Sequence, residues 1–178
     1  MPKPQVAPLV GERISLRLLD ELSLPLTLEW RNKVRIRSHL RTSRELSMEE
    51  HLLWYRSYAK RDTEFVFLVL QRERRDRAIG QVSIYDIDRA QGTAEFGRLM
   101  IGEDDVLQQG YGGEASAKAV EFAFGECGLQ ELRLEAYATN TRALSIYVAL
   151  GFGIWDRHDD GLLQMRLRKC AEQRIQRE

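Results

Sequence analysis

The stretch Gln108-Gln109-Gly110-Tyr111-Gly112-Gly113-Glu114-Ala115 decides the fold class of this chain. It lies between a strand-like segment, 94–101, and a segment with helical periodicity that runs to about Glu126. Three glycines in four residues are an unusual start for a helix unless the backbone must approach another molecule closely. Without Cβ atoms, successive N–H groups can surround an anion, and the helix dipole adds partial positive charge there. The stretch therefore predicts a turn that binds a phosphate group.

Length and composition are those of a single globular domain. The chain has 178 residues, 43% of them hydrophobic, which is enough for one sizeable core. Lys plus Arg and Asp plus Glu both number 27, so no overall charge draws the chain to nucleic acid or to an anionic membrane. No apolar run reaches the roughly 20 residues that span a bilayer, and residues 1–6 lack the apolar stretch of a secretion signal. We therefore expect a cytoplasmic protein without nucleic-acid or membrane partners.

Cysteine and histidine positions indicate neither a disulfide framework nor a metal centre. Cys127 and Cys170 are too few for a framework and too far apart in the sequence for a CxxC motif. His39, His51 and His158 lack the spacing of metal ligands. We therefore expect no metal.

Strand and helix signals alternate through one domain, 1–178. Ser47 with Glu50 forms a capping box, and Asn140 is a good N-cap for a helix that Gly151 ends. Because hairpins outnumber crossovers, we expect an α/β fold with a mixed, mostly antiparallel sheet of about seven strands and about four flanking helices. The expected strands are 13–18, 65–70, 78–86, 94–101, 131–138, 152–156 and 162–168; the expected helices are 22–33, 48–60, the glycine stretch to 126, and 140–150.

Several explanations compete for the glycine stretch. A P-loop would end in Gly-Lys-Ser/Thr, which this stretch lacks. A dinucleotide fingerprint, G-x-G-x-x-G/A, is matched by Gly110, Gly112 and Ala115, with Glu135 downstream as the ribose partner. Against it, residues 103–107 separate the strand from the turn, and only about 60 residues remain for the other strands of a doubly wound sheet. The last alternative is a turn that binds nothing.

Two motifs in residues 93–152 resemble the core of the GCN5-related N-acetyltransferase (GNAT) superfamily. In that family a strand leads to a loop written Arg/Gln-x-x-Gly-x-Gly/Ala, and here Leu107 begins the corresponding stretch, Leu-Gln-Gln-Gly-Tyr-Gly. About thirty residues later the family shows Asn-x-x-Ala-x-x-x-Tyr-x-x-x-Gly-Phe, which residues 140–152 match at every fixed position. Leu107 departs from the usual Arg or Gln and would weaken one pyrophosphate contact. The resemblance implies acetyl-CoA as the co-substrate.

The resemblance also implies how acetyl-CoA is held. Asn140, Ala143 and Tyr147 are spaced i, i+3 and i+7 and share one helix face. The small Ala143 would let the pantetheine arm approach, and Asn140 would hydrogen-bond its amides. The two central strands, 94–101 and 132–138, would splay to admit that arm. The implied contacts are Leu99, Met100, Ile101, Gln108, Gln109, Gly110, Tyr111, Gly112, Gly113, Glu114, Asn140, Ala143, Ile146 and Tyr147.

Acetyl transfer to an amine requires a proton for the departing thiolate and a group that takes the proton of the amine. A thiol has a pKa of about 8.5 and a phenol of about 10, so Tyr147 can serve as the general acid. A backbone N–H near the end of the central strand would hold the oxyanion. Glu135 and Glu95, on neighbouring strands, are the two candidate bases; otherwise they are exposed carboxylates paired with Arg98 or Arg133.

The N-terminal half, about 9–90, is expected to bind the acceptor, and about 91–168 to bind acetyl-CoA, before a charged tail at 169–178. Aromatic planes with arginines suit a ligand that has a ring and phosphates, although core packing and a solvated face would explain the same residues. The patterns at 30–32 and 47–54 resemble acetyltransferases of nucleotide-linked amino sugars, as in the pseudaminic acid pathway. The implied acceptor residues are Trp30, Arg31, Arg37, His51, Trp54 and Tyr55.

The sequence therefore predicts an acetyl-CoA-dependent N-acetyltransferase whose acceptor is a small-molecule amine, preferably a nucleotide-linked amino sugar. Relatives that share the Gly-Tyr-Gly-x-Glu-Ala version of the loop acetylate the N-terminus of a ribosomal protein, which is the first alternative. A non-catalytic acetyl-CoA-binding protein and a dinucleotide-binding protein are the other two. Dimers are common among relatives, so a homodimer is a further expectation.

Overall fold

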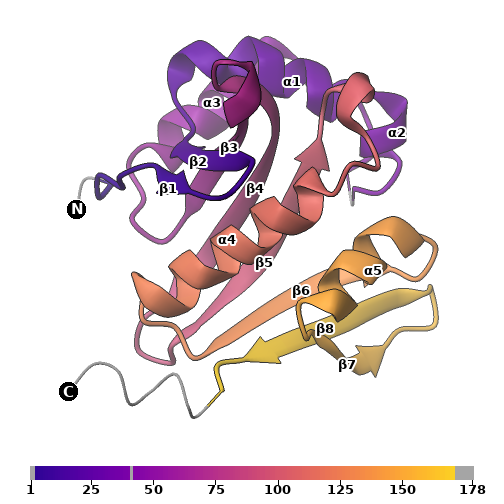
Figure 1. The fold of residues 1–178 in the computed structure, drawn as a ribbon. Helices are drawn as coiled ribbons and strands as arrows, with labels where there is room; N and C mark the ends of the chain where they lie inside the picture. The colour runs from indigo at the N-terminus through magenta and orange to yellow at the C-terminus, as the bar shows by residue number, and fades with distance from the viewer. Residues whose placement is uncertain (1–2, 41, 171–178) are drawn as a thin grey trace.

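The computed structural model of the protein describes residues 3–40 and 42–170. Within them the chain forms an eight-stranded sheet with the order β1-β2-β3-β4-β5-β6-β8-β7 (Figure 1). Neighbouring strands pair antiparallel except β5 and β6, which are parallel. The strands are β1 (Leu9–Val10), β2 (Ile14–Leu18), β3 (Phe65–Gln71), β4 (Arg77–Asp88), β5 (Thr93–Ile101), β6 (Glu131–Tyr137), β7 (Gly153–Arg157) and β8 (Leu162–Arg168).

Helices cover both faces of this sheet. Figure 1 shows α4 crossing one face, with α1 and α3 on the other. Short 3-10 turns precede α1 and α4. The helices are α1 (Leu24–Asn32), α2 (Val34–Arg37), α3 (Met48–Tyr58), α4 (Tyr111–Gly125) and α5 (Thr141–Ala149), and the 3-10 turns are η1 (Glu21–Ser23), η2 (Arg72–Arg74) and η3 (Asp104–Val106).

Two apolar clusters hold the helices to the sheet. The larger one joins the sheet to α4 and α5, and the smaller one joins it to α1 and α3. Every residue of β3 is buried, because its odd-numbered side chains from Phe65 to Val69 enter the first cluster and its even-numbered ones from Val66 to Leu70 enter the second. This explains why the strand is a continuous apolar run rather than an alternating one.

The two central strands separate soon after they meet. Parallel pairing joins β5 to β6 from Thr93 to Glu95, and in the described residues it does not continue toward Ile101. Figure 1 shows the two strands diverging from that point. We call the unpaired space between them, beyond Glu95 and Arg133, the splay. The splay that the sequence resemblance implied is therefore present.

A β-bulge interrupts β5 inside the splay. Gly97 lies opposite Ser83 of β4, whereas Met100 lies opposite Gln81, so β5 contains one extra residue between these pairs. Arg98, within the bulge, has a φ of 49°, in the left-handed region. The extra residue reverses the alternation of side chains, and it turns the main chain at the point where β5 leaves β6.

Helix starts follow the sequence signals at α3 and α5 and differ at α4. Ser47 Oγ accepts from Glu50 N at 3.2 Å while Glu50 Oε2 accepts from Ser47 N at 2.8 Å, the predicted capping box. Asn140 Oδ1 accepts from Ala143 N at 3.3 Å. Gly110, the N-cap of α4, has a φ of 85°, and no described side chain caps this helix. The first amides of α4 are therefore left for another acceptor.

The expected fold class is confirmed, with differences in detail. All seven predicted strands and all four predicted helices are present, so the sheet is mixed and mostly antiparallel. The two-residue β1 and the four-residue α2 were not predicted, because each spans only about one period of its pattern, too short for a periodic signal. The predicted helix 22–33 begins instead as η1, and α3 ends at Tyr58 rather than at 60.

In the described part of the chain, every helix is too short or too polar to cross a bilayer. The division into an acceptor half and an acetyl-CoA half stays a prediction. Residues 171–178 of the charged tail lie outside the described residues.

Candidate active site

The first turn of α4 presents main-chain amides to one side of the molecule. Its first internal hydrogen bond runs from Glu114 N to Gly110 O at 3.1 Å, so the preceding N–H groups have no acceptor within the helix. Gln108 has a φ of 62°, and this conformation curls the chain just ahead of the helix. A Cβ on Gly113 would meet no described atom within 4 Å, so the turn is open there. We call residues 108–113 the glycine turn; its geometry suits an anion.

Glu114 supports the glycine turn from behind. Its Oε1 accepts from Arg13 N at 2.8 Å and from Ile14 N at 3.3 Å, and its Oε2 accepts from Arg13 Nε at 3.1 Å. Burial alone would raise the pKa of the Glu114 carboxyl, but these hydrogen bonds outweigh burial and hold that pKa below its usual value. The side chain is thus committed to the start of β2. Its predicted contact with acetyl-CoA has no support from this arrangement.

Tyr111 also turns its side chain inward. Its ring is buried beneath the Arg13 guanidinium, 4.7 Å from the ring centroid, and its hydroxyl accepts from Gln71 Nε2 at 2.9 Å. Arg13 Nη1 donates to Gln109 O at 2.9 Å and ties the turn to β2. Gln109 Nε2 donates to Asp105 O at 2.8 Å, so the side chains of both Tyr111 and Gln109 are used within the protein.

Three of the predicted acetyl-CoA segments meet at Gly112. A Cβ there would lie 3.4 Å from Ile146 Cδ1 of α5 and 3.7 Å from Ile101 Cγ1 of β5. The glycine turn, the splayed end of β5 and the face of α5 with Ala143 are therefore adjacent. Asn140 uses Oδ1 as the cap of α5, which leaves its Nδ2 group as the donor for a ligand. Leu99 and Met100 lie on the same stretch of β5, Leu99 within the bulge and Met100 directly after it.

Tyr147 is placed beside the splay by α5. Its side chain is 7% exposed, with the ring edge-on to Phe96 of β5 at a centroid distance of 5.8 Å. Burial, with a smaller contribution from Tyr85, raises the pKa of Tyr147 to about 12. The phenol is therefore protonated at neutral pH and available as a proton donor.

The two candidate bases project from the opposite face of the sheet. Leu134 and Ala136 of β6 enter the core beneath α4 and α5, so Glu135 between them points the other way. Glu95 is flanked in the same manner by buried Ala94 and Phe96. Gln164 Nε2 of β8 donates to Glu135 Oε1 at 3.2 Å. The predicted acid and the predicted bases thus approach the splay from its two sides.

No sequence pattern marked Tyr85 of β4, and Arg98 of the bulge was considered only as an ion-pair partner of the two carboxylates. Tyr85 lies directly opposite Glu95, and its ring covers Gly97, where a Cβ would lie 3.2 Å from the phenol oxygen. The Arg98 guanidinium lies 4.3 Å from the centroid of the Tyr85 ring. A glycine inside a predicted strand is the signal that would have marked this spot, since it often indicates a bulge or a close approach.

Trp30, Arg31 and Arg37, predicted to bind the acceptor, instead hold their own chain together. Trp30 is 0% exposed, and its Nε1 donates to Glu103 Oε1 at 2.8 Å, so it offers no surface to a ligand. The two arginines donate to main-chain carbonyls between α2 and α3, where the described residues 38–40 and 42–47 form no helix or strand. Their bonds run from Arg31 to Thr42 O at 2.6 Å and Arg44 O at 2.9 Å, and from Arg37 to Ser43 O at 2.9 Å.

The other three predicted acceptor residues lie together on α3. His51 is buried, with its Nε2 3.0 Å from Thr27 Oγ1 and its ring stacked on Trp54 at 5.2 Å. Burial, and then the charge of Arg31, lowers the pKa of His51, which favours the neutral imidazole. Trp54 and Tyr55 are half-buried, so their rings are the ones among these aromatic residues that reach the surface. Trp54 lies near β5, with the Arg98 guanidinium 5.9 Å from its ring, whereas Tyr55 packs beside Tyr58 of the same helix at 5.7 Å.

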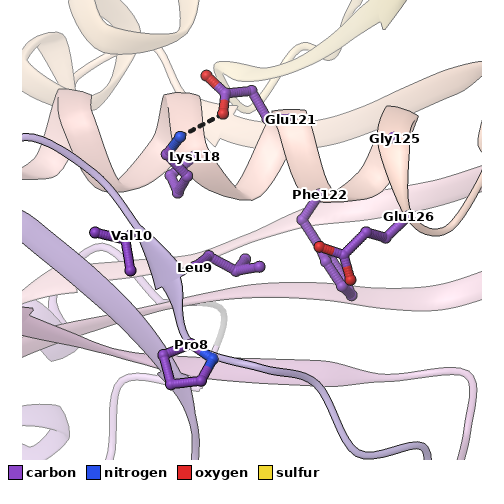
Figure 2. Close-up of a pocket in the computed structure, with 8 residues that line it drawn as sticks. All are labelled: Pro8, Leu9, Val10, Lys118, Glu121, Phe122, Gly125 and Glu126. Atoms are coloured by element: carbon purple, nitrogen blue, oxygen red, sulfur yellow. Dashed lines mark hydrogen bonds and ion pairs between the residues drawn. The ribbon is translucent and has the colours of Figure 1, made fainter.

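Two shallow surface hollows lie elsewhere. Figure 2 shows the first, between the N-terminal strand and α4, where Lys118 and Glu121 form an ion pair at 2.5 Å. The second lies around Glu131 and the paired ends of β5, β6 and β8. Neither hollow includes a residue predicted for the site. Among residues 3–40 and 42–170, no cluster of three His, Cys, Asp or Glu side chains is arranged to hold a metal ion.

Similar structures share this architecture at low sequence identity. Spermidine N-acetyltransferase from Vibrio cholerae, in complex with CoA and spermine, superposes with a TM-score of 0.78 at 20% identity, over 89% of this chain and 96% of that one. A domain from Methanocaldococcus jannaschii DSM 2661 gives 0.77 at 20% identity, over 89% and 100%. A GNAT-family acetyltransferase from Bacillus anthracis gives 0.76 at 13% identity, over 91% and 98%. No curated protein sequence matches the chain.

The sequence itself matches the family model of the acetyltransferase (GNAT) domain over residues 13–153. That range contains the glycine turn, the splay and α5. The chain therefore belongs to the GNAT family of acetyl-CoA-dependent N-acetyltransferases.

Proposed function

We propose that the protein transfers the acetyl group of acetyl-CoA directly to a primary amine, with Tyr147 as the general acid. The observation that carries this proposal is the meeting of three segments at Gly112: the amides of the glycine turn, the splayed end of β5 and the helix that bears Tyr147. An anion held by the turn would leave the rest of a long ligand lying along the splay, beside the phenol.

Different parts of the protein would bind different parts of acetyl-CoA. The amides from Gly110 to Gly113 would hold the diphosphate, because helix N-termini bind anions well. The main chain of β5 at Leu99 and Met100 would align the pantetheine arm in place of the missing β6 partner. Asn140 Nδ2 would donate to that arm, and the small side chain of Ala143 leaves room for it.

Tyr147 is suited to protonate the leaving thiolate. Its pKa of about 12 lies above the roughly 8.5 of an exposed thiol. A thiolate that forms beside the same buried ring is also desolvated, and desolvation raises its proton affinity in parallel. The phenol can therefore give up its proton when the negative charge develops next to it, and at no earlier point.

The acceptor enters from the face that α1 and α3 cover. Glu95, opposite Tyr85, and Glu135 of β6 both project on this face, and the Arg98 guanidinium there is paired with the buried Glu64. This surplus of negative charge would attract a protonated amine. Glu95 and Glu135 are the two groups we propose as bases.

A nucleotide-linked amino sugar stays our first candidate for the acceptor, supported by the aromatic surface of Trp54 and Tyr55. The commitment of Arg31 and Arg37 to main-chain carbonyls removes part of the basis for that choice. A polyamine is the second candidate, because the carboxylates around Tyr85 suit a polycation and the Vibrio cholerae neighbour is a spermidine N-acetyltransferase. A protein N-terminus is the third.

A panel of amines tests the proposal, with release of free thiol from acetyl-CoA as the readout. The panel compares nucleotide-linked amino sugars, spermidine and spermine, and N-terminal peptides. The class with the highest kcat/KM identifies the acceptor. Thiol release that no amine accelerates would contradict the transferase proposal and favour a non-catalytic acetyl-CoA-binding protein. Light scattering on the same preparation checks the predicted homodimer.

A further inference from the structure

Tyr85 is a polar residue at the splay that the mechanism above does not use. β4 places it directly opposite Glu95 of β5, so the two side chains are neighbours on one face of the sheet. Ile84 enters the core beneath α4, which confirms that Tyr85 points toward the opposite face, the one that receives the acceptor.

The phenol of Tyr85 lies where the splay opens. Its ring covers Gly97, with the phenol oxygen 3.2 Å and Cε1 3.3 Å from the position of a Cβ on that residue. Gly97 follows the last paired residue of β5, Glu95, by two positions. Tyr147 lies on the other side, because its ring packs edge-on against Phe96, the residue that follows Glu95 in β5. A phenol therefore stands on each side of the opening.

Arg98 fixes the Tyr85 ring in this position. Its guanidinium lies 4.3 Å from the ring centroid and is also paired with the buried carboxylate of Glu64. The left-handed conformation of Arg98, with a φ of 49°, is unfavourable for a residue with a side chain. Such strain is commonly found where a functional group must be aimed.

The charged groups that face Tyr85 keep it protonated. Burial raises its pKa, Arg98 partly opposes that rise, and the carboxylates of Glu95, Asp86 and Glu135 reinforce it. With Tyr147 these groups come from β4, β5, β6 and α5. A protonated phenol can accept a proton on its oxygen while it donates its own, which is the property of a relay.

We propose that Tyr85 relays the proton of the attacking amine to Glu95; this inference rests on the acetyl transfer proposed above. As the nitrogen bonds to the acyl carbon, an N–H proton moves to the phenol oxygen of Tyr85, and the phenolic proton moves to the Glu95 carboxylate. The carbon–sulfur bond then breaks, and Tyr147 gives its proton to the thiolate. Glu95 afterwards releases one proton to solvent and Tyr147 regains one, so charge and protons balance.

The substitution Tyr85→Phe tests the relay, because it keeps the ring over Gly97 and beneath Arg98 and removes only the hydroxyl. With an amine whose pKa lies well above the assay pH, we expect kcat/KM to fall about 10- to 100-fold while the dissociation constant of CoA is unchanged. With an amine whose pKa lies below the assay pH, the loss should shrink to less than about threefold, since a weakly basic nitrogen loses its proton without help.

Tyr58→Phe is the matched control. Tyr58 is a buried phenol whose hydroxyl donates to Val66 O at 3.3 Å, so its loss should lower the Tm without any dependence of the rate on amine basicity.

Two results would overturn the relay: unchanged kcat/KM in Tyr85→Phe, or an equal loss with both amines, which would show a packing role. Both results leave the transferase intact. A wild-type protein that acetylates no amine would instead remove the proposed function and the relay with it.

Discussion

The half of the molecule around α4 and α5 and the half around α1 to α3 carry sequence signals of different kinds. In the first, the motifs specify backbone geometry: Gly110 has the positive φ that begins α4, and Asn140 caps α5. In the second, the prediction rested on the gathering of aromatic and basic residues. In the structure Trp30, at the start of that pattern, is buried in the core, and Arg31 donates to carbonyl groups of a loop. A motif that requires a particular backbone conformation predicts the local structure directly. A cluster of aromatic and basic residues, by contrast, does not predict whether each side chain points to the core or to the surface.

The arginines have a physical reason for their actual role. The described residues between α2 and α3, 38–40 and 42–47, form no strand or helix that would satisfy their carbonyl groups, and main-chain polar groups require partners. An Arg side chain carries five donors in a rigid fork, so Arg31 can satisfy two carbonyls at once. The same donors that suit a diphosphate therefore suit an irregular loop.

The largest expected effect tests the half around α4 and α5. Tyr147→Phe keeps the ring against Phe96 but removes the proposed acid, so kcat should fall about 10²- to 10³-fold. The dissociation constant of CoA, measured by calorimetry, should stay within about twofold of the wild-type value. If this variant transferred the acetyl group as fast as the wild-type protein, Tyr147 would not be the general acid.

A comparison of two glycines in α4 tests whether the glycine turn binds the diphosphate. Gly113 lies in the open turn and Gly125 at the other end of the helix, and a Cβ on either would meet no described atom within 4 Å. Gly113→Ala and Gly125→Ala should both stabilise the protein by about 0.5–1 kcal/mol. Only Gly113→Ala should weaken acetyl-CoA binding, by roughly tenfold, because its methyl group occupies the anion site. Equal affinities of the two variants for acetyl-CoA would contradict the binding of the diphosphate at the glycine turn.

Two substitutions with smaller expected effects test the role of the half around α1 to α3 in acceptor binding. Trp54→Ala should raise the KM of the acceptor several-fold and leave that of acetyl-CoA unchanged, because its ring forms part of the proposed acceptor surface. Arg31→Met should lower the stability by about 1 kcal/mol, through its two hydrogen bonds, with no change in the KM of the acceptor. If Arg31→Met alone changed the KM of the acceptor, Arg31 rather than Trp54 would be the residue that contacts the acceptor.

The smallest effect concerns the support of the glycine turn. The pKa of Glu114 is lowered in the folded state, so its contribution to stability is complete above its ordinary value of 4.5 and disappears as the pH falls through the folded value. Glu114→Gln should therefore cost about 1 kcal/mol at neutral pH, and this cost should shrink as the pH falls below 4.5, as measured by urea unfolding. Glu12→Gln, at an exposed position nearby, is the control. A cost independent of pH would contradict this role for the carboxylate.

Much of the fold followed from the sequence, because the long strands and helices have clear periodicity and caps. Gly97 inside the predicted strand was the one local sign of the bulge at Arg98. Its position could not be fixed from the sequence, because the extra residue is visible only in the pairing with β4. Tyr85 was missed because its neighbours Glu95 and Gly97 belong to another strand. The register between two strands cannot be deduced from the residues around Tyr85 alone. The meeting of Gly112 with Ile146, by contrast, follows from two motifs that the sequence shows separately.

The account depends most on one claim, that the glycine turn holds the diphosphate so that the thioester lies beside Tyr147. A crystal structure of the protein with CoA tests it directly. We predict phosphate oxygens within about 3.2 Å of the amides of the glycine turn and the thiol sulfur within about 4 Å of the Tyr147 hydroxyl. A diphosphate bound elsewhere, or a thiol far from this phenol, would contradict the account.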